Sequence, residues 1–242
     1  ARPGQTEKYQ PISTLATIRH LEAEGFNLHG VQVTGTRKVE RQGFQRHVIR
    51  MRAPGTVAKV GDAIPEVLAI NSFDGTSAWV LMPGMLRLAC LNGLMVGMPW
   101  ATIRVRHAGD VLPRVADGMR LVASMFDRIA ERVQVYQRTM MTEDAARDFA
   151  ERTHALRWPD ATLAPVTPHK LLIARRADDA DDTLWNVYNR AQEHLITGGQ
   201  AGTRVINGRI RRSTTRGVHS IGENVRINRA LFTLADTFAD AA

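Results

Sequence analysis

The spacing of apolar residues changes part-way along this chain, and this change limits what the chain can fold into. Two segments near the N-terminus, "NLHGVQVTG" and "FQRHVIRMRAP", alternate apolar and polar residues as a half-buried strand does, and the turn-like "TRKVERQG" lies between them. These segments predict a β-hairpin. From about residue 110 the apolar residues recur at nearly helical spacing instead. We therefore expect a strand-rich N-terminal half and a helical C-terminal half.

The N-terminal half contains further predicted elements around this hairpin. "STLATIRHLEAEG" reads as a short amphipathic helix, with Ser13 as its N-cap and Gly25 as its end. "IPEVLAINSFDG" predicts a third strand that ends in an Asp74-Gly75 turn, and "TIRVRHAGD" predicts another strand. The segment "SAWVLMPGMLRLACLNGLMVG" is apolar throughout; Pro83-Gly84 should break it, and the part that follows fits a strand or a helix.

The spacing of apolar residues in the C-terminal half predicts four helices. They are a long helix from Asp110 to about Met140, a second over 142–157, "TLWNVYNRAQEHLITGG" ended by Gly198-Gly199, and a closing helix in "VRINRALFTLADTFADA". The acidic run 177–182 precedes the third helix and suits its N-terminus.

The predicted fold class is α+β: an antiparallel sheet with a β-hairpin, packed on a long helix and followed by a helical C-terminal part. Three prolines make residues 154–170 the best linker candidate. We accordingly divide the chain into an α+β core, residues 1–157, and a helical extension with a basic loop, residues 158–242. The two need not be separate domains.

Arginine dominates the charge of this chain. Its 242 residues include 32 basic and 24 acidic side chains, a net charge of +8, and because four of the basic residues are lysines, 28 are arginines. The planar guanidinium binds phosphate with two parallel hydrogen bonds and stacks on bases. This composition favours nucleic acid as the partner.

The positive charge is clustered in two places. Residues 198–229 hold seven arginines and one acid, Glu223, in a glycine-rich segment that we expect to be a loop between two helices. The predicted N-terminal hairpin is also basic, and Trp100, Phe44 and Trp79 are candidates to stack on bases near it. A surface loop without a partner stays open as the alternative. The predicted nucleic-acid contacts are Arg37, Lys38, Arg46, Arg50, Arg52, Arg104, Arg106, Arg204, Arg209, Arg211, Arg212 and Arg216.

Little in the sequence points to catalysis. Cys90 is the only cysteine, which rules out an intrachain disulfide, and its apolar neighbours "LRLACLNG" favour a buried small side chain. Asp74, His107 and Asp110 form no known metal-binding motif, and there is no Walker-type phosphate loop. We therefore expect no enzyme activity, no metal and no cofactor. No apolar run reaches the roughly 18 residues of a membrane span, and a reducing cytoplasm is the expected compartment.

Several segments resemble a known family. "NSFDGTSAW", "MLRLACLNGLMVG", "IRVRHAGDV", "WNVYNRAQEHLITGG", "RRSTTRG" and "NRALFTLAD" occur here in the order and spacing of the plasmid- and prophage-encoded YubP, YafZ and YfjQ-like family of unassigned function. That family looks remotely similar to the single-strand annealing proteins RecT, Redβ, Erf and the Rad-type annealers. The latter combine a helix, a hairpin-bearing antiparallel sheet and a long helix, and they form rings or filaments around a basic groove.

The resemblance and the charge clusters together imply a function. We expect a non-enzymatic protein that binds single-stranded DNA without sequence preference and promotes annealing as a homo-oligomer, a ring or a filament. A different class stays open as the alternative: a protein-interaction module of a plasmid or prophage, such as an anti-restriction protein or a host-factor inhibitor. A metal-dependent nuclease is disfavoured because the acidic residues are not clustered in the sequence.

Overall fold

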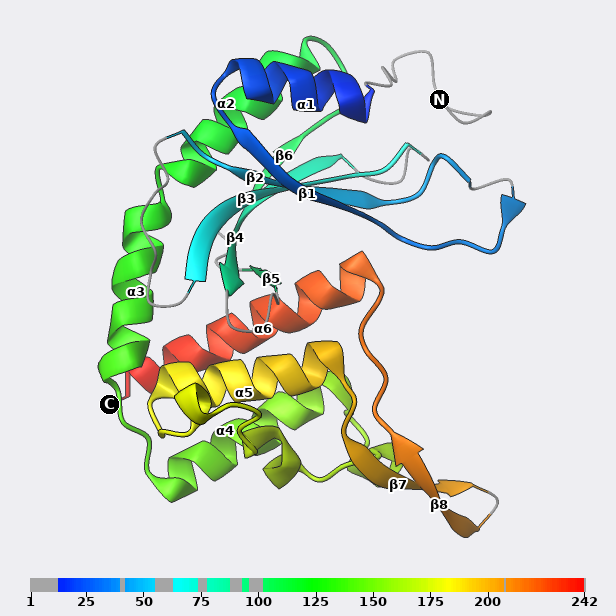
Figure 1. Ribbon diagram of the computed structural model, residues 1–242, viewed down its shortest axis with the longest axis vertical. Helices are drawn as coiled ribbons and strands as arrows, with labels where there is room; N and C mark the ends of the chain where they lie inside the picture. The colour runs from blue at the N-terminus through cyan, green and yellow to red at the C-terminus, as the bar shows by residue number, and fades with distance from the viewer. Residues whose placement is uncertain are drawn as a thin grey trace. The chain divides into compact units, whose positions relative to one another are not determined.

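The computed structural model describes residues 13–39, 42–54, 63–73, 78–87, 93–95, 102–206 and 208–241. Its chain divides into two compact units, residues 1–129 and residues 130–242. The first unit is built on an antiparallel sheet, and the second consists of helices and one β-hairpin (Figure 1). The predicted α+β class is confirmed.

The sheet of the first unit follows the order of the sequence. Strands β1 to β4 are neighbours in that order and all pairs are antiparallel, while β5 and β6 both pair with β4 on its other side (Figure 1). The predicted N-terminal hairpin is therefore confirmed as the pair β1–β2. The strands are β1 (Asn27–Val33), β2 (His47–Arg52), β3 (Ala63–Asn71), β4 (Trp79–Arg87), β5 (Gly93–Met95) and β6 (Ile103–Val105).

Helices α1 (Thr14–Ala23) and α2 (Val111–Ala123) cover one face of this sheet (Figure 1). The Ser13 hydroxyl caps α1, and Gly25 follows the helix with a φ of 86°, as the sequence predicts. Helix α2 lies close to the strands, because a Cβ at Gly118 would come 2.5 Å from Leu81 Cδ1. The buried side chains between sheet and helices include Leu21, Ile49, Met51, Val67, Ala69, Leu81, Val115, Met119 and Val122.

Strand β4 runs without interruption through Pro83-Gly84, where the sequence predicts a break. On one side of β4, Pro83 lies opposite Val67 of β3. On the other side, β6 pairs with residues 79–81 and β5 with residues 84–86, so Pro83 falls in the gap between these two partners. No ladder hydrogen bond is lost on that side, and the proline is tolerated inside a central strand.

The predicted long helix from Asp110 to Met140 is two helices, α2 and α3 (Phe126–Arg138). The Ser124 hydroxyl donates to the Leu121 carbonyl at 2.8 Å, and the Met125 amide donates to Val122 at 3.1 Å. These short-range bonds tighten the backbone and end α2, as serine side chains do when they compete for helical carbonyls. The apolar spacing continues into α3, which explains why the pattern reads as one helix.

The second unit contains three predicted helices, α4 (Glu143–Arg157), α5 (Leu184–Thr197) and α6 (Ile221–Ala239). Each begins at a hydroxyl N-cap, Thr142, Thr183 or Ser220, that accepts from an amide three residues on. Asp181 in the acidic run also accepts from the Thr183 amide at 3.1 Å, as suits the start of α5. No helix within the described residues is both long enough and apolar enough to span a membrane.

Aromatic side chains form the core of the second unit. Tyr136, Tyr188 and Phe232 contact one another with ring centroids 5.5–6.4 Å apart, and Phe238 meets Phe149 edge to face at 5.3 Å. The Tyr136 hydroxyl donates to Asp236 at 2.7 Å, which satisfies its buried oxygen. Packing of this kind supplies most of the stability of short helices.

The proline-rich segment is not an extended linker. It forms short 3-10 turns, η3 (Ala161–Leu163) and η4 (Pro168–Leu172), and η5 (Ala177–Asp179) follows. Val166 and Leu171 are buried, and His154 Nε2 bonds the Val166 carbonyl at 2.8 Å. The boundary expected at residues 157/158 falls inside the second unit, because this segment packs on the helices that flank it.

A buried ion pair lies on the opposite face of the sheet from α1 and α2. Glu66 is fully buried; its Oε2 accepts a hydrogen bond from Arg50 Nε at 2.7 Å, and the charged Arg50 Nη2 lies 2.7 Å from the same oxygen. His29 lies 3.6 Å from the other carboxylate oxygen. The sequence predicts Arg50 as a phosphate contact, but its charge is neutralised by Glu66, so its first role is to hold a buried carboxylate.

Replacing Arg50 with Gln should lower the free energy of unfolding by about 3 kcal/mol, because the buried Glu66 carboxylate loses its partner. Urea denaturation at pH 7 measures this change. The double variant Arg50→Gln, Glu66→Gln should recover most of the loss, since two amides can hydrogen-bond without a buried charge. If the double variant is as unstable as the single one, the ion pair is not the cause.

Candidate nucleic-acid interface

The segment "RVINGRIRRSTTRG", expected to be a loop, is mostly a β-hairpin. Strands β7 (Ala201–Ile206) and β8 (Arg209–Thr214) pair antiparallel, with Ile206 opposite Arg209, so two residues connect them. Gly208 in this connection has a φ of 70°. An Asn-Gly pair between alternating residues is a strong signal for a two-residue hairpin turn, and this signal is in the sequence.

The cross-strand register sorts the side chains onto two faces. Arg204 is opposite Arg211, and Arg209 lies two residues before Arg211 along β8, so these three arginines share one face. Arg212 lies on the other face, together with the Val205–Ile210 pair. That apolar pair is open to solvent, with Val205 65% and Ile210 76% exposed.

The hairpin's arginines carry charge that the protein does not neutralise. Arg204, Arg209, Arg211 and Arg212 are exposed, and none of them forms an ion pair with an acid in the described part of the chain. Other arginines of this unit are paired, for example Arg226 with Glu223 at 2.6 Å. The hairpin is therefore a local concentration of uncompensated positive charge.

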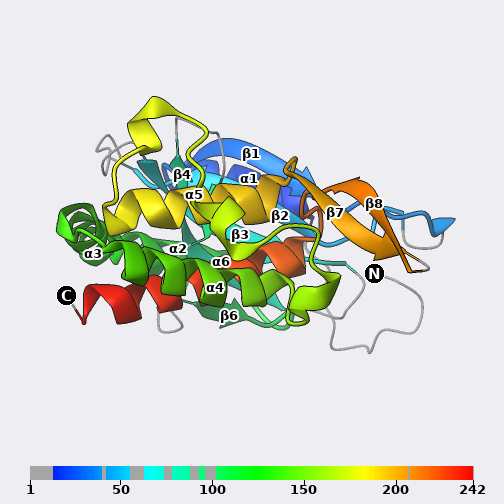
Figure 2. The same cartoon turned by 90° about the horizontal axis from the view of Figure 1, so that it is seen from below.

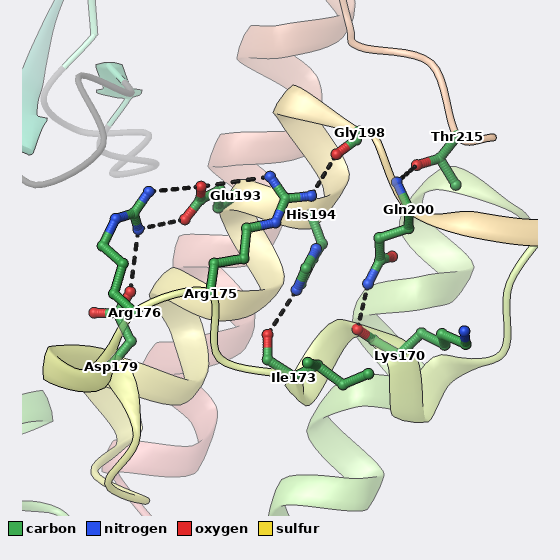
Figure 3. Close-up of polar contacts among 10 residues, drawn as sticks. All are labelled: Lys170, Ile173, Arg175, Arg176, Asp179, Glu193, His194, Gly198, Gln200 and Thr215. Atoms are coloured by element: carbon green, nitrogen blue, oxygen red, sulfur yellow. Dashed lines mark hydrogen bonds and ion pairs between the residues drawn. The ribbon is translucent and has the colours of Figure 1, made fainter.

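A hydrogen-bond network fixes the strand ends at the base of the hairpin (Figure 3). The Gly199 amide donates to the Thr215 carbonyl at 2.8 Å, and the Gln200 amide donates to the Thr215 hydroxyl at 2.9 Å. Arg175 donates to the Gly198 carbonyl, and the Gln200 side chain donates to the Lys170 carbonyl. The two chain segments that enter and leave the hairpin are thus held to each other, and the entering segment is also held to residues 170–175.

Glu193 of α5 organises the arginines behind this base (Figure 3). Its two carboxylate oxygens accept from Arg176 at 2.6 and 2.8 Å, and Arg175 lies 3.4 Å from one of them. Arg176 also contacts the buried Asp179 at 3.2 Å. Burial alone would raise the pKa of Glu193, but the hydrogen bonds and charges of Arg176 and Arg175 lower it below its ordinary value.

A second attachment joins β7 to the proline-rich segment. The Thr203 amide donates to the Pro165 carbonyl at 2.8 Å. Gly202 makes this approach possible, because a Cβ at that position would lie 1.8 Å from the Pro165 oxygen. Arg157 donates to the carbonyls of Leu195 and Arg216 and so bridges the end of α5 to the chain after β8.

An open hollow lies along the base of the hairpin. It is lined by Arg212 and by the hydroxyl side chains of Thr203, Ser213 and Thr214. Hydroxyls and a guanidinium are donors that bind phosphate oxygens. The strands project beyond the ends of α4 and α5 in both views, which leaves this hairpin accessible (Figures 1 and 2).

The other predicted contacts lie in the first unit, apart from Arg216, which is exposed just after β8. Arg37 and Lys38 are exposed in the connection between β1 and β2, and Arg46 is half-buried where β2 begins.

Arg104 and Arg106 are exposed at β6. They lie on the face opposite the buried Val105 and His107, as the predicted alternation requires. Arg50 binds Glu66, and Arg52 Nη2 lies 3.4 Å from His29.

The aromatic candidates give no stacking surface among the described residues. Trp79 is fully buried in the core of the first unit, which corrects its proposed contact with bases. Phe44 is half-buried, and Trp100 lies outside the described residues. Asp74 and Cys90 also lie outside them, and the part of the chain that is described contains no group of three metal-binding side chains.

Sequence reasoning missed a buried polar row in the first unit. His47 and Asn71 are opposite each other on β2 and β3, and His107 Nε2 bonds Asn71 Oδ1 at 2.7 Å. The rings of His47 and His107 flank Trp79 at 6.4 and 6.3 Å between centroids. Burial lowers the pKa of His47. His107 is buried and hydrogen-bonded, and this row belongs to the framework of the sheet.

Comparisons with known proteins place the chain in a family. Residues 5–232 match the family described as a domain of unknown function, DUF932. The chain belongs to the DUF932 family. It is 34% identical to the protein YafZ of Escherichia coli K12 over 233 residues, which cover 96% of this chain and 83% of YafZ. It is also 34% identical to YfjQ of the same organism over 234 residues, 97% of this chain and 84% of YfjQ.

The DUF932 relatives confirm the resemblance that the sequence segments indicate, and they carry no assigned activity. No solved structure matches this chain. The function of this DUF932 chain must therefore be inferred from its own structure.

The close contact at Gly202 yields a test of the hairpin's attachment. Replacing Gly202 with Ala should destabilise the second unit by about 1–3 kcal/mol, because the added methyl overlaps the Pro165 carbonyl. Urea denaturation measures the loss of stability, and amide hydrogen exchange in β7 and β8 shows whether the hairpin is affected. Gly35→Ala is the control, since nothing lies within 4 Å of that position. Equal effects of both variants would contradict the attachment.

His194 gives the hairpin base a pH dependence. Its Nε2 bonds the Ile173 carbonyl at 2.7 Å, its Nδ1 is buried and unpartnered among the described residues, and burial lowers its pKa from the ordinary 6.5. The unfolded chain then binds a proton that the folded chain does not, so stability should fall as the pH drops below about 6.5. The slope from this group is at most about 1.4 kcal/mol per pH unit.

The variant His194→Gln should flatten this slope between pH 6.5 and 5 when unfolding free energies are measured by urea. The exposed His219→Gln serves as the control and should leave the slope unchanged. An unchanged slope in His194→Gln would assign the pH dependence to other groups.

Proposed function

We propose that this protein binds single-stranded DNA without sequence preference through the hairpin β7–β8, acts as a homo-oligomer in the cytoplasm, and promotes strand annealing rather than catalysing a reaction. The observation that carries the proposal is the set of four exposed hairpin arginines that the described protein leaves without acidic partners. Keeping four like charges together costs free energy, and a polyanion offsets that cost.

The spacing of the arginines suits a nucleic-acid backbone. Arg209 and Arg211 are two residues apart on one face of β8, which separates them by about 7 Å along the strand. Each guanidinium can therefore bind its own phosphate, and Arg204 lies directly across from Arg211 to add a third contact.

The hairpin base supports this role by limiting the motion of the arginines. The amides of Gly199 and Gln200 hold the two ends of the hairpin together at Thr215, and the Thr203 amide attaches β7 to the Pro165 carbonyl. A binding surface that is ordered before the ligand arrives loses less entropy on binding. On the other face, Arg212 and the hydroxyls of the hollow offer a further phosphate site next to the first.

In this proposal the protein contacts the phosphates of the strand rather than its bases. Within the described residues no Phe, Tyr or Trp is fully exposed, so aromatic stacking, the usual complement of phosphate contacts in single-strand binders, has little support there. Contacts to phosphate carry no sequence information. Binding should therefore be tolerant of sequence and steeply dependent on salt.

One observation favours the second candidate function, a protein-interaction module. The Val205–Ile210 pair places two exposed apolar side chains on the hairpin face opposite Arg204, Arg209 and Arg211. Apolar groups of this kind are typical anchors of a protein contact, and an acidic host protein would also suit the arginines. Binding of single-stranded DNA by the purified chain separates the two candidates.

The triple variant Arg204→Gln, Arg209→Gln, Arg211→Gln should weaken binding to a labelled single-stranded oligonucleotide at least tenfold at 0.1 M salt. It should also reduce the slope of log affinity against log salt by about 2, because each lost phosphate contact contributes about 0.7 for single strands. Fluorescence anisotropy across a salt series measures both quantities.

The matched control removes three arginines that are exposed but ion-paired: Arg120→Gln, Arg147→Gln, Arg152→Gln. It has the same net charge as the test variant, so an equal loss of affinity in both would mean that overall charge, not the hairpin, binds DNA. No binding by the parent protein at low salt would refute the proposal and leave the protein-interaction module. If the parent protein binds the oligonucleotide, an annealing assay with complementary strands is the next experiment.

A further inference from the structure

Strand β1 is the open edge of the sheet in the first unit. Six of its seven residues are exposed, and three of these have large apolar side chains: Leu28 is 42% exposed, Val31 49% and Val33 56%. No charged residue and no proline occurs in "NLHGVQV". Natural edge strands are usually protected against pairing by charges or prolines, and β1 lacks both.

The backbone of β1 has hydrogen-bonding groups that point away from β2. The Thr34 amide donates to the Arg46 carbonyl at 2.9 Å, so Thr34 belongs to a hydrogen-bonded pair. Such pairs alternate along an antiparallel ladder, which directs the amides of Gln32 and Gly30 toward β2 as well. The N–H and C=O groups of Val31 and Val33 therefore point outward, and no hydrogen bond reaches them from the described residues.

The exposed apolar side chains continue the covered face of the sheet. Val31 is opposite Ile49 and Leu28 is opposite Met51, both of which are fully buried in the core beneath α1 and α2. The irregularity between Leu28 and Gly30 keeps Leu28 on the same face as Val31. Leu28, Val31 and Val33 thus form an apolar ridge where the core reaches the edge of the sheet.

Charge indicates which partner suits this edge. The chain carries a net charge of +8, so two copies repel each other over most of their surface. Along the neutral β1 this repulsion is smallest, whereas an acidic partner would find no positive side chain on the strand itself. The ridge is also self-complementary, because antiparallel pairing brings the apolar side chains of two copies side by side.

We propose that β1 pairs antiparallel with β1 of a second copy of this chain, to form a two-fold dimer with one continuous sheet. The outward amides of Val31 and Val33 donate to carbonyls of the other copy, and the two ridges bury each other. A two-fold contact uses the same patch on both copies and closes on itself. This interface gives a dimer, and a ring or filament requires a second interface. The inference holds whether or not the hairpin binds DNA.

The variant Val31→Pro tests this pairing. Proline removes the outward N–H of residue 31 without removing a β1–β2 hydrogen bond, and Gly30 before it tolerates the restricted backbone. Light scattering coupled to size-exclusion chromatography should find a dimer for the parent chain at micromolar concentration and a monomer for Val31→Pro. The isosteric Val31→Thr keeps the N–H and should remain dimeric with weaker association. A monomeric parent chain, or a dimeric Val31→Pro, overturns the proposal.

A measurement on the unmodified chain keeps the test independent of folding. In the dimer the amides of Val31 and Val33 are hydrogen-bonded, so their hydrogen exchange should slow at least tenfold as the protein concentration is raised. The amide of Gln32 faces β2 and should change less. Exchange of Val31 and Val33 that is fast at every concentration rules out β1 pairing. If the chain is dimeric by light scattering while these amides stay fast, the interface lies elsewhere.

DNA binding separates this inference from the proposed function. A monomeric Val31→Pro variant that still binds the oligonucleotide leaves the hairpin proposal intact. Loss of binding in the hairpin arginine variant, with dimerisation unchanged, leaves the β1 interface intact.

Discussion

The carboxylate of Glu193 is the contact on which the arrangement of the second unit's basic hairpin depends. It is 6% exposed, and it holds Arg176 and Arg175 in fixed positions. Arg175 in turn binds the carbonyl of Gly198, where α5 ends and the chain turns toward β7. A buried ion pair adds little net stability compared with apolar packing, but breaking it is costly. Its contribution here is one of position, because it fixes the angle at which the hairpin leaves the helices.

The distribution of acids explains why the hairpin stays basic. Many carboxylates in the described part of the chain pair with arginines outside the hairpin, such as Glu66 with Arg50 in the first unit and Glu223 with Arg226 in the second. At the hairpin's base, burial lowers the pKa of Arg157; the charge of Glu223 opposes this shift, and repulsion from Arg204 adds a smaller lowering effect. An anion bound along the strands would relieve that repulsion, so the electrostatic cost of the free protein becomes part of the driving force for binding.

Local sequence patterns predict most of the helices and strands, but the exact ends of these elements and their partners depend on contacts with distant residues. Ser13 and Gly25 bound α1 as expected, because capping depends on neighbouring residues alone. Pro83 failed as a strand breaker because its tolerance depends on where β5 and β6 pair with β4, which no local pattern shows. The basic segment is a hairpin rather than the predicted loop, because its Asn-Gly pair forms a tight turn between two strands despite the surrounding glycines and charges. Arg50 is ion-paired rather than free to bind phosphate, because its partner Glu66 lies on the next strand, which no local pattern shows.

Salt acts in opposite directions on the two proposed interactions, and this couples them. Phosphate binding releases counterions and weakens as salt rises, whereas pairing of two +8 chains through a neutral strand strengthens as salt screens their repulsion. DNA bound to the hairpins neutralises the same charge that salt screens. DNA should therefore favour the β1 dimer, and by linkage the dimer should bind DNA more tightly than the monomer by the same factor. No direct contact between the hairpin and β1 is needed for this cooperativity, because the long-range charge of the chain carries it.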